Sequence, residues 1–184
     1  FAVALRMMQE LAEWMGEPEF AAECKALYDR QQALCRTLAW DGAWFRRCIT
    51  DEGRFIGSES EPQAKIWLNT QSWVVLSGLG TQEQQRQAMD SVKKYLDTDL
   101  GIKKIHPAMT TDYPTKEENL TCYNKGCGEN GSVFCHANTW AIIAECMLGR
   151  TENAWKYYHQ LLPMIAQKTA GAERYKAEPY VYSS

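Results

Sequence analysis

Three features that the sequence lacks narrow the class of protein. The 184-residue chain has no apolar run approaching the roughly 20 residues that a membrane-spanning helix requires, so we expect no membrane partner. It has no excess of positive charge, because 20 Lys and Arg residues are scattered among 23 Asp and Glu residues, and we expect no nucleic-acid partner. It also lacks an initiator methionine and a signal peptide, and we expect residues 1–184 to be one incomplete domain excised from a longer chain.

The seven cysteines lack the spacing of a metal site. Cys122, Cys127 and Cys135 precede His136, but their separations of five and eight residues match none of the usual zinc-ligand pairs. Cys135 and His136 are neighbours whose side chains would diverge on a helix, which argues against a Cys–His nucleophile. The odd number of cysteines favours free thiols in a reducing compartment, so we expect a cytoplasmic protein, and the spacings lead us to expect no metal.

Apolar residues recur at helical spacing along most of the chain. A Gly-Glu-Pro turn at 16–18 separates the first two predicted helices, and Thr81 is the expected N-cap of the fourth. The predicted helices span residues 2–15, 18–37, 70–78, 81–96, 137–148 and 152–166, with a short β-hairpin at 44–56. Successive helical pairs separated by elaborate loops favour an all-α fold of the α/α toroid type.

Residues 97–132 show no credible periodicity. A connection of that length is several times longer than usual and points to a functional loop. We therefore expect this segment to be irregular and to contribute to the site.

The end of this loop carries the densest cluster of polar and flexible residues. Three glycines between 126 and 131 allow the backbone to approach a ligand closely, and Glu129 and Asn130 lie among them. His136 follows at the expected start of a helix, where free amides and the helix dipole suit a bound anion such as phosphate. The alternative is structural: Glu129 and Asn130 cap a turn, and His136 is a half-buried side chain with satisfied hydrogen bonds.

Several runs resemble those of glycoside hydrolase family 94, which contains the inverting cellobiose, cellodextrin and chitobiose phosphorylases. The runs follow the order and approximate spacing of that family from residue 40 onward. They are WDGAWFRR at 40–47, IGS at 56–58, KIWLNTQSW at 65–73, ENG at 129–131 with His136, and EPYV at 178–181. The resemblance implies a partial (α/α)6 barrel with long active-site loops, of which this chain would be an internal portion.

The resemblance also implies roles for individual residues. In this family inorganic phosphate, a co-substrate, attacks the anomeric carbon while a carboxylic acid protonates the departing oxygen, which yields a sugar 1-phosphate of inverted configuration. His136 matches the phosphate-binding histidine, and Tyr123, Glu129 and Asn130 match the acceptor-sugar site. The general acid is expected upstream of Phe1, so no catalytic residue is assigned here and the chain alone is expected to be inactive.

The resemblance favours a cellobiose or cello-oligosaccharide phosphorylase, with chitobiose and other β-glucoside phosphorylases as alternatives. Members of the family commonly carry a basic residue just before Glu-Asn-Gly, whereas this chain has Gly128, which opens space on the acceptor side. A homodimer is the oligomeric state considered for the parent protein.

Two alternative functions belong to other classes of protein. One is a noncatalytic carbohydrate-binding toroid, and the other is an inverting hydrolase on the same barrel, which would need a carboxylate base where His136 stands. Tryptophans could stack on sugar rings in any of these, but at helical positions they more often pack in the core. We expect core positions for Trp73, Trp140 and Trp155.

Overall fold

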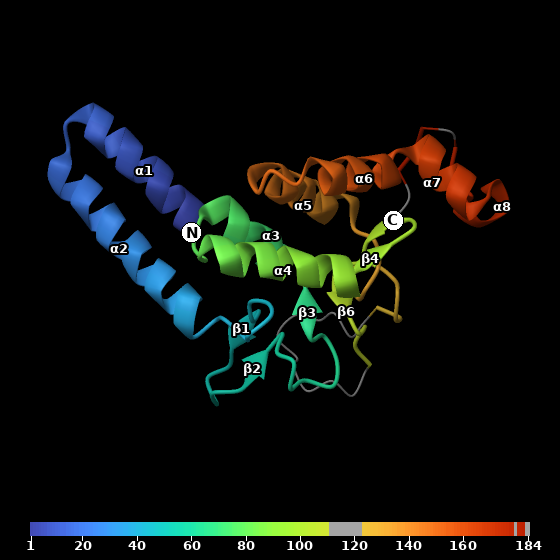
Figure 1. Ribbon diagram of the computed structural model, residues 1–184, viewed down its shortest axis with the longest axis horizontal. Coiled ribbons are helices and arrows are strands. Elements are labelled where there is room, and N and C mark those ends of the chain that lie inside the picture. Colours follow the sequence, from blue (N-terminus) through green and yellow to red (C-terminus); the bar gives the residue numbers. More distant parts are fainter. Residues whose placement is uncertain (111–122, 179, 183–184) are drawn as a thin grey trace.

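The computed structural model describes residues 1–110, 123–178 and 180–182, and most of its helices form pairs (Figure 1). The pairs are α1 (Ala2–Met15) with α2 (Pro18–Thr37), α3 (Leu68–Ser77) with α4 (Gln82–Tyr95), and α5 (Cys135–Met147) with α6 (Thr151–Leu161). Two shorter helices, α7 (Pro163–Ala170) and α8 (Ala172–Tyr175), follow. The prediction of a mostly helical chain is confirmed, whereas its place in an (α/α)6 barrel stays a prediction.

Local signals set the ends of α1 and α3 and the starts of α2 and α4. Gly16 and Gly78 adopt left-handed conformations, with φ of 77° and 71°, after α1 and α3, and Pro18 is the first residue of α2. Thr81 and Gln84 form a capping box before α4: Thr81 Oγ1 accepts from Gln84 N, and Gln84 Oε1 accepts from Thr81 N, both at 3.1 Å. The predicted N-cap is confirmed.

The last predicted helix, residues 152–166, is divided in the structure. α6 ends at Leu161, Leu162 is extended with ψ of 124°, and α7 begins at Pro163. Proline disfavours the helical conformation of the residue before it and has no N–H to donate, so it begins a new helix instead of continuing the old one. A single helix here was a wrong prediction.

α3 and α5 pack side by side through small residues. Ala137, Ala141 and Ala144 repeat at helical spacing on α5 and are fully buried, so the two helices can approach closely. Larger side chains from α3 and from neighbouring elements complete this core: Leu68, Val75, Met89, Val92, Leu96, Ile102 and Tyr157.

Three short antiparallel ladders connect the helical pairs. They join β1 (Cys48–Ile49) to β2 (Phe55–Ile56), β3 (Ile66–Trp67) to β6 (Ile105–His106), and β4 (Asp97–Thr98) to β5 (Gly101–Ile102). The β1–β2 ladder confirms the predicted hairpin. The expectation that 97–132 is irregular was wrong for β4, β5 and β6, because strands of two residues are too short to show alternation; residues 111–122 of that segment lie outside the described residues.

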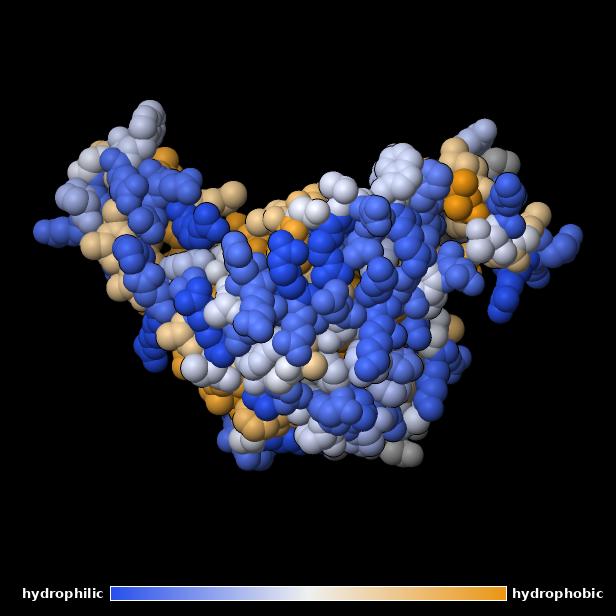
Figure 2. Space-filling model, in the orientation of Figure 1, coloured by the Kyte–Doolittle hydropathy of each residue, from blue (hydrophilic) through white to orange (hydrophobic). Residues whose placement is uncertain are grey.

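α1 and α2 extend away from the other helices, and apolar side chains appear at their surface (Figures 1 and 2). On α1 the exposed apolar residues are Met7, Met8, Leu11, Trp14 and Met15. Trp73 and Trp155 are exposed too, at 39% and 62%, so the prediction of core positions was wrong for these two, whereas Trp140 is half-buried. The described residues leave these helix faces uncovered. None of the described helices is both long and apolar enough to cross a membrane.

A buried carboxylate lies toward the C-terminal end of α5. Glu145 is fully buried, and Arg150 Nε lies 2.8 Å from its Oε2. Arg150 also lies 2.8 Å from Asp90 Oδ1 on α4. Burial raises the pKa of the Glu145 carboxyl, and attraction to Arg150 opposes that rise only in part.

We predict that, as the pH falls, the parent protein gains stability relative to a variant in which Glu145 is replaced by glutamine. The pKa of Glu145 in the folded protein lies above the unfolded value of 4.5, so between these two values the folded protein binds a proton that the unfolded chain releases. Lowering the pH from neutrality toward 4.5 should therefore raise the unfolding midpoint of the wild type relative to that of Glu145→Gln, measured by thermal unfolding at each pH. If the difference between the two unfolding midpoints stays constant with pH, or if the wild type loses stability relative to Glu145→Gln as the pH falls, the prediction is wrong.

Candidate functional site

His136 lies in the first turn of α5 and is exposed. Phe134 occupies the N-cap position, and its side chain makes no capping hydrogen bond, so it supplies no acceptor to the first amides of the helix. The His136 ring lies 4.3 Å from the Trp140 ring and 5.5 Å from the Phe134 ring, centroid to centroid. This end of α5 combines N–H donors, the positive end of the helix dipole and an oriented imidazole, which together suit an anion.

The starts of α3 and α5 are joined through one residue. Leu68 N donates to Lys104 O, and Lys104 N donates to Ser132 O, both at 2.9 Å. Leu68 is the first residue of α3, and Ser132 lies just before α5. The two helix starts therefore lie side by side on the backbone of Lys104.

One turn into each helix, two tryptophans meet. The rings of Trp73 on α3 and Trp140 on α5 are in edge contact, with centroids 5.1 Å apart. Asn69 and His136 each precede one of these tryptophans by four residues, which is one helical turn. Asn69 and His136 therefore occupy equivalent positions at the same end of the two helices.

A cavity of about 650 Å³ runs along α3 at this place, and its lining includes Arg47, Asn69, Thr70, Trp73 and Trp140. Asn69 Oδ1 and Thr70 Oγ1 are buried, and no described residue bonds to either atom. Buried polar atoms normally have a partner, so these two are candidates for contact with a ligand. Neither residue was expected in the site, because Asn69 and Thr70 belong to a run of four polar residues at the start of α3 and nothing in the sequence distinguishes them from Gln71 and Ser72.

Glu129 lies in the turn before α5 and forms an ion pair with Lys104. The Glu129 side chain is 40% exposed and that of Lys104 is 11% exposed. Lys104 Nζ also lies 5.2 Å from the centroid of the Phe134 ring, which in turn contacts His136, so a continuous chain of contacts links Glu129 to His136. Lys104 was not among the predicted site residues, because it is 25 residues from Glu129 and no local pattern connects them.

Asn130 is fully buried and turned toward the backbone of the loop. Its Oδ1 accepts from Met109 N at 2.7 Å, and its Nδ2 donates to Met109 O at 2.9 Å and to Tyr123 O at 3.0 Å. These bonds occupy the side-chain amide, so Asn130 shapes the loop and does not face solvent as a sugar ligand would. The Tyr123 side chain itself is exposed and lies against Gly128.

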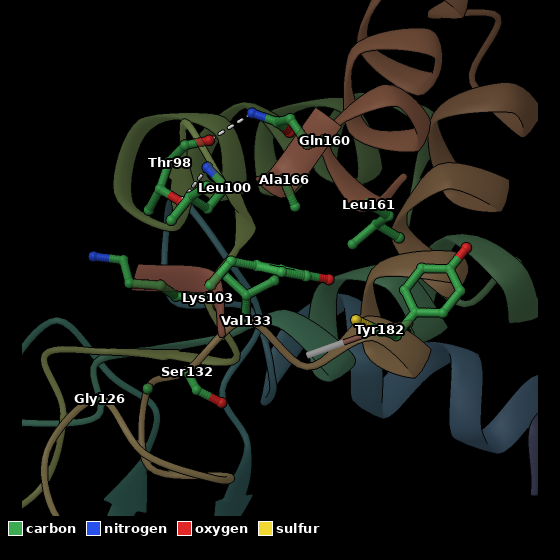
Figure 3. A pocket seen from close by; sticks show the side chains of 13 residues that line it. Thr98, Leu100, Lys103, Gly126, Ser132, Val133, Gln160, Leu161, Ala166 and Tyr182 are labelled. Atoms are coloured by element: carbon green, nitrogen blue, oxygen red, sulfur yellow. Dashed lines mark hydrogen bonds between the residues drawn. The ribbon is translucent and has the colours of Figure 1, made fainter. Parts of the chain in front are cut away.

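A second cavity, of about 310 Å³, adjoins the same loop (Figure 3). Figure 3 shows the Gln160 amide turned toward Thr98, where Nε2 donates to the Thr98 carbonyl oxygen. The cavity is lined by Lys103, Ser132 and Val133 among others, and neither Glu129 nor His136 lines it or the cavity along α3. The contacts that link Glu129 through Lys104 and Phe134 to His136 place the candidate site at the starts of α3 and α5 and in the turn around Glu129.

The described residues contain no group of three or more His, Cys, Asp or Glu side chains that could hold a metal ion. Cys122, one of the cysteines considered above, lies outside them. The chemistry that the site offers is hydrogen bonding: an imidazole and helix amides for an anion, and a carboxylate for hydroxyl groups.

The whole chain, residues 1–184, matches the family described as "Glycosyl hydrolase 94 superfamily, catalytic domain". It is 32% identical over 182 residues to solabiose phosphorylase of Paenibacillus borealis, covering 98% of this chain and 23% of that protein. It is 33% identical over 182 residues to N,N'-diacetylchitobiose phosphorylase of Vibrio proteolyticus, covering 97% of this chain and 22% of that protein. It is 29% identical over 160 residues to 3-O-beta-D-glucopyranosyl-beta-D-glucuronide phosphorylase of Paenibacillus borealis, covering 87% and 20%.

The chain thus spans less than a quarter of the length of these relatives, and they differ among themselves in the disaccharide they are named for. The match along its full length agrees with the resemblance seen in the sequence runs. The chain belongs to the catalytic domain of the glycosyl hydrolase 94 superfamily.

Proposed function

We propose that the protein containing this chain catalyses the inverting phosphorolysis of a β-linked glucoside, with cellobiose or a cello-oligosaccharide as substrate. One observation carries the proposal: His136 stands at the start of α5, where no side chain caps the helix, and its ring contacts Trp140. Trp140 in turn lines the cavity that Asn69 and Thr70 line, whose buried side-chain oxygens have no partner among the described residues. The names of the relatives support phosphorolysis in general.

In this reaction a phosphate oxygen forms a bond to the anomeric carbon as the bond from that carbon to the glycosidic oxygen breaks. A carboxylic acid supplied by the rest of the protein protonates the departing oxygen, and phosphate takes the place that activated water has in an inverting hydrolase. His136 and the first amides of α5 hold the phosphate dianion, because N–H donors and the helix dipole favour negative charge there. Inorganic phosphate is a co-substrate, and no cofactor takes part.

The acceptor half of the substrate binds at the turn around Glu129. The carboxylate of Glu129 accepts hydrogen bonds from sugar hydroxyls, and the exposed ring of Tyr123 packs on an apolar face of the sugar. Asn130 contributes by holding Met109 and the backbone of Tyr123 in place. Chitobiose and other β-glucosides are the alternative substrates.

We predict that His136→Ala lowers phosphorolysis by the full-length protein by about 100-fold, the usual cost of removing one donor to a reacting anion. The measurement is phosphate-dependent release of the sugar 1-phosphate: glucose 1-phosphate from cellobiose and longer cello-oligosaccharides, and the amino-sugar 1-phosphate from chitobiose. His159→Ala is the matched control, because His159 also packs on a tryptophan, Trp155, at 4.8 Å, but on α6. It should keep wild-type activity.

The same assay separates the rival functions. Release of free sugar without phosphate would point to a hydrolase. Binding of the sugars with no turnover under any condition would point to a noncatalytic toroid. Either result would replace the phosphorylase proposal.

We predict that Asn69→Asp raises the KM for phosphate by about tenfold, because a carboxylate near the bound dianion repels it across a partly buried site. The KM for the glucoside should change much less. Gln82→Glu, at the start of α4, is the control, since it adds the same charge at an exposed side chain away from the site. If both KM values change equally while the variant keeps a normal thermal transition, Asn69 is not part of the phosphate site.

A further inference from the structure

In the ion pair between Lys104 and Glu129, the lysine is the more buried partner. Lys104 has an 11% exposed side chain and lies over the Phe134 ring at 5.2 Å, whereas the Glu129 side chain is 40% exposed. The group of this pair that a ligand can reach is therefore the carboxylate. The ammonium behind it fixes its position.

The residue directly before Glu129 offers no cation. Gly128 occupies this position with φ of 50° and has no side chain that could pair with the carboxylate. A Cβ added to it would lie 2.9 Å from Tyr123 Cδ1 and 3.0 Å from Tyr123 Cε1. The Tyr123 ring therefore occupies the place of a side chain at 128, and Lys104 brings its ammonium to Glu129 from a different segment.

The backbone of Lys104 is held independently of its side chain. Its N–H and C=O bond to Ser132 and Leu68, both at 2.9 Å. We call these two backbone hydrogen bonds of Lys104, which connect the starts of α3 and α5, the joint. Replacing the side chain leaves the joint in place, so the function of the ammonium can be tested by itself.

The charge arrangement selects among acceptors. A carboxylate has only acceptor atoms, so it binds the hydroxyl donors of a neutral sugar and repels a sugar that carries its own carboxylate. The ammonium that would attract such an acidic sugar is already paired and largely covered. An aldonate or uronate acceptor would thus meet the negative member of the pair first.

From this geometry we infer that Lys104 is a positioning residue that fixes the Glu129 carboxylate for a neutral acceptor sugar and thereby excludes acidic ones. The inference rests on the proposed function, since it names the acceptor class of the same site.

The test uses the full-length protein in the synthetic direction, with glucose 1-phosphate as donor. The acceptors are glucose, cellobiose and N-acetylglucosamine as neutral sugars, and glucuronic acid as the acidic one. Lys104→Met should raise the KM of the best neutral acceptor about tenfold or more, the loss expected for a charge-assisted hydrogen bond, with the KM for glucose 1-phosphate unchanged. Lys104→Arg should recover part of the loss.

Removing the two charges singly and then together gives a second test. It measures the preference for acidic over neutral acceptors, which would not change if Lys104 only stabilised the fold. Glu129→Gln leaves the Lys104 ammonium without its counter-charge, so the ratio of glucuronic acid to neutral-acceptor use should rise. In the double variant Lys104→Met with Glu129→Gln, that rise should disappear. Lys156→Met is the matched control, because Lys156 also pairs with a carboxylate, Asp97, and lies 5.9 Å from the centroid of the Tyr157 ring, yet is on α6.

Three results would overturn the inference: an unchanged acceptor KM in Lys104→Met, an equal rise of both KM values, or a wild type that prefers glucuronic acid. If the wild type transfers nothing from glucose 1-phosphate and performs no phosphorolysis, it is the proposed function that fails. Calorimetric binding of the same sugars then decides on Lys104. Weaker binding of neutral sugars by Lys104→Met would uphold its role, and unchanged binding would refute it.

Discussion

Two helices of this chain begin on the same short extended segment, and the candidate site depends on that constraint. The backbone of Lys104 bonds on one side to Leu68, where α3 begins, and on the other to Ser132, just before α5. Directly beside it, β6 pairs with β3, the strand that leads into α3. Because the starts of the two helices share this segment, Asn69 and His136 lie at the same end of the helix pair.

Buried side-chain amides hold the segments around this joint. Asn138 on α5 bonds to both backbone groups of Ile102 at 2.8 Å, and Asn130 bonds in the same way to Met109. Gln71 on α3 does the same for Phe45, with bonds of 2.8 and 3.0 Å. Ladders of two residues leave neighbouring backbone groups without a strand partner, and a buried carboxamide supplies the missing donor and acceptor. The described parts of these connections are thereby held without long strands.

The joint couples the two halves of the proposed site. Lys104 joins the helix starts through its backbone and pairs with Glu129 through its side chain, while Phe134 lies between Lys104 and His136. The anion-binding end of α5 and the carboxylate of the acceptor turn are therefore built on one residue. A shift of that segment would move both together.

The sequence by itself determined the features that have local causes. Apolar periodicity, the turn at Gly16 and Pro18, and the Thr81 cap set the first helices, and the run after the loop set His136 at the start of α5. Only the tertiary structure decided that Lys104 pairs with Glu129, that Asn130 turns inward to Met109, and that Asn69 stands level with His136. These contacts join residues far apart in the chain, and spacing along a sequence carries no information about which distant segments the packing brings together.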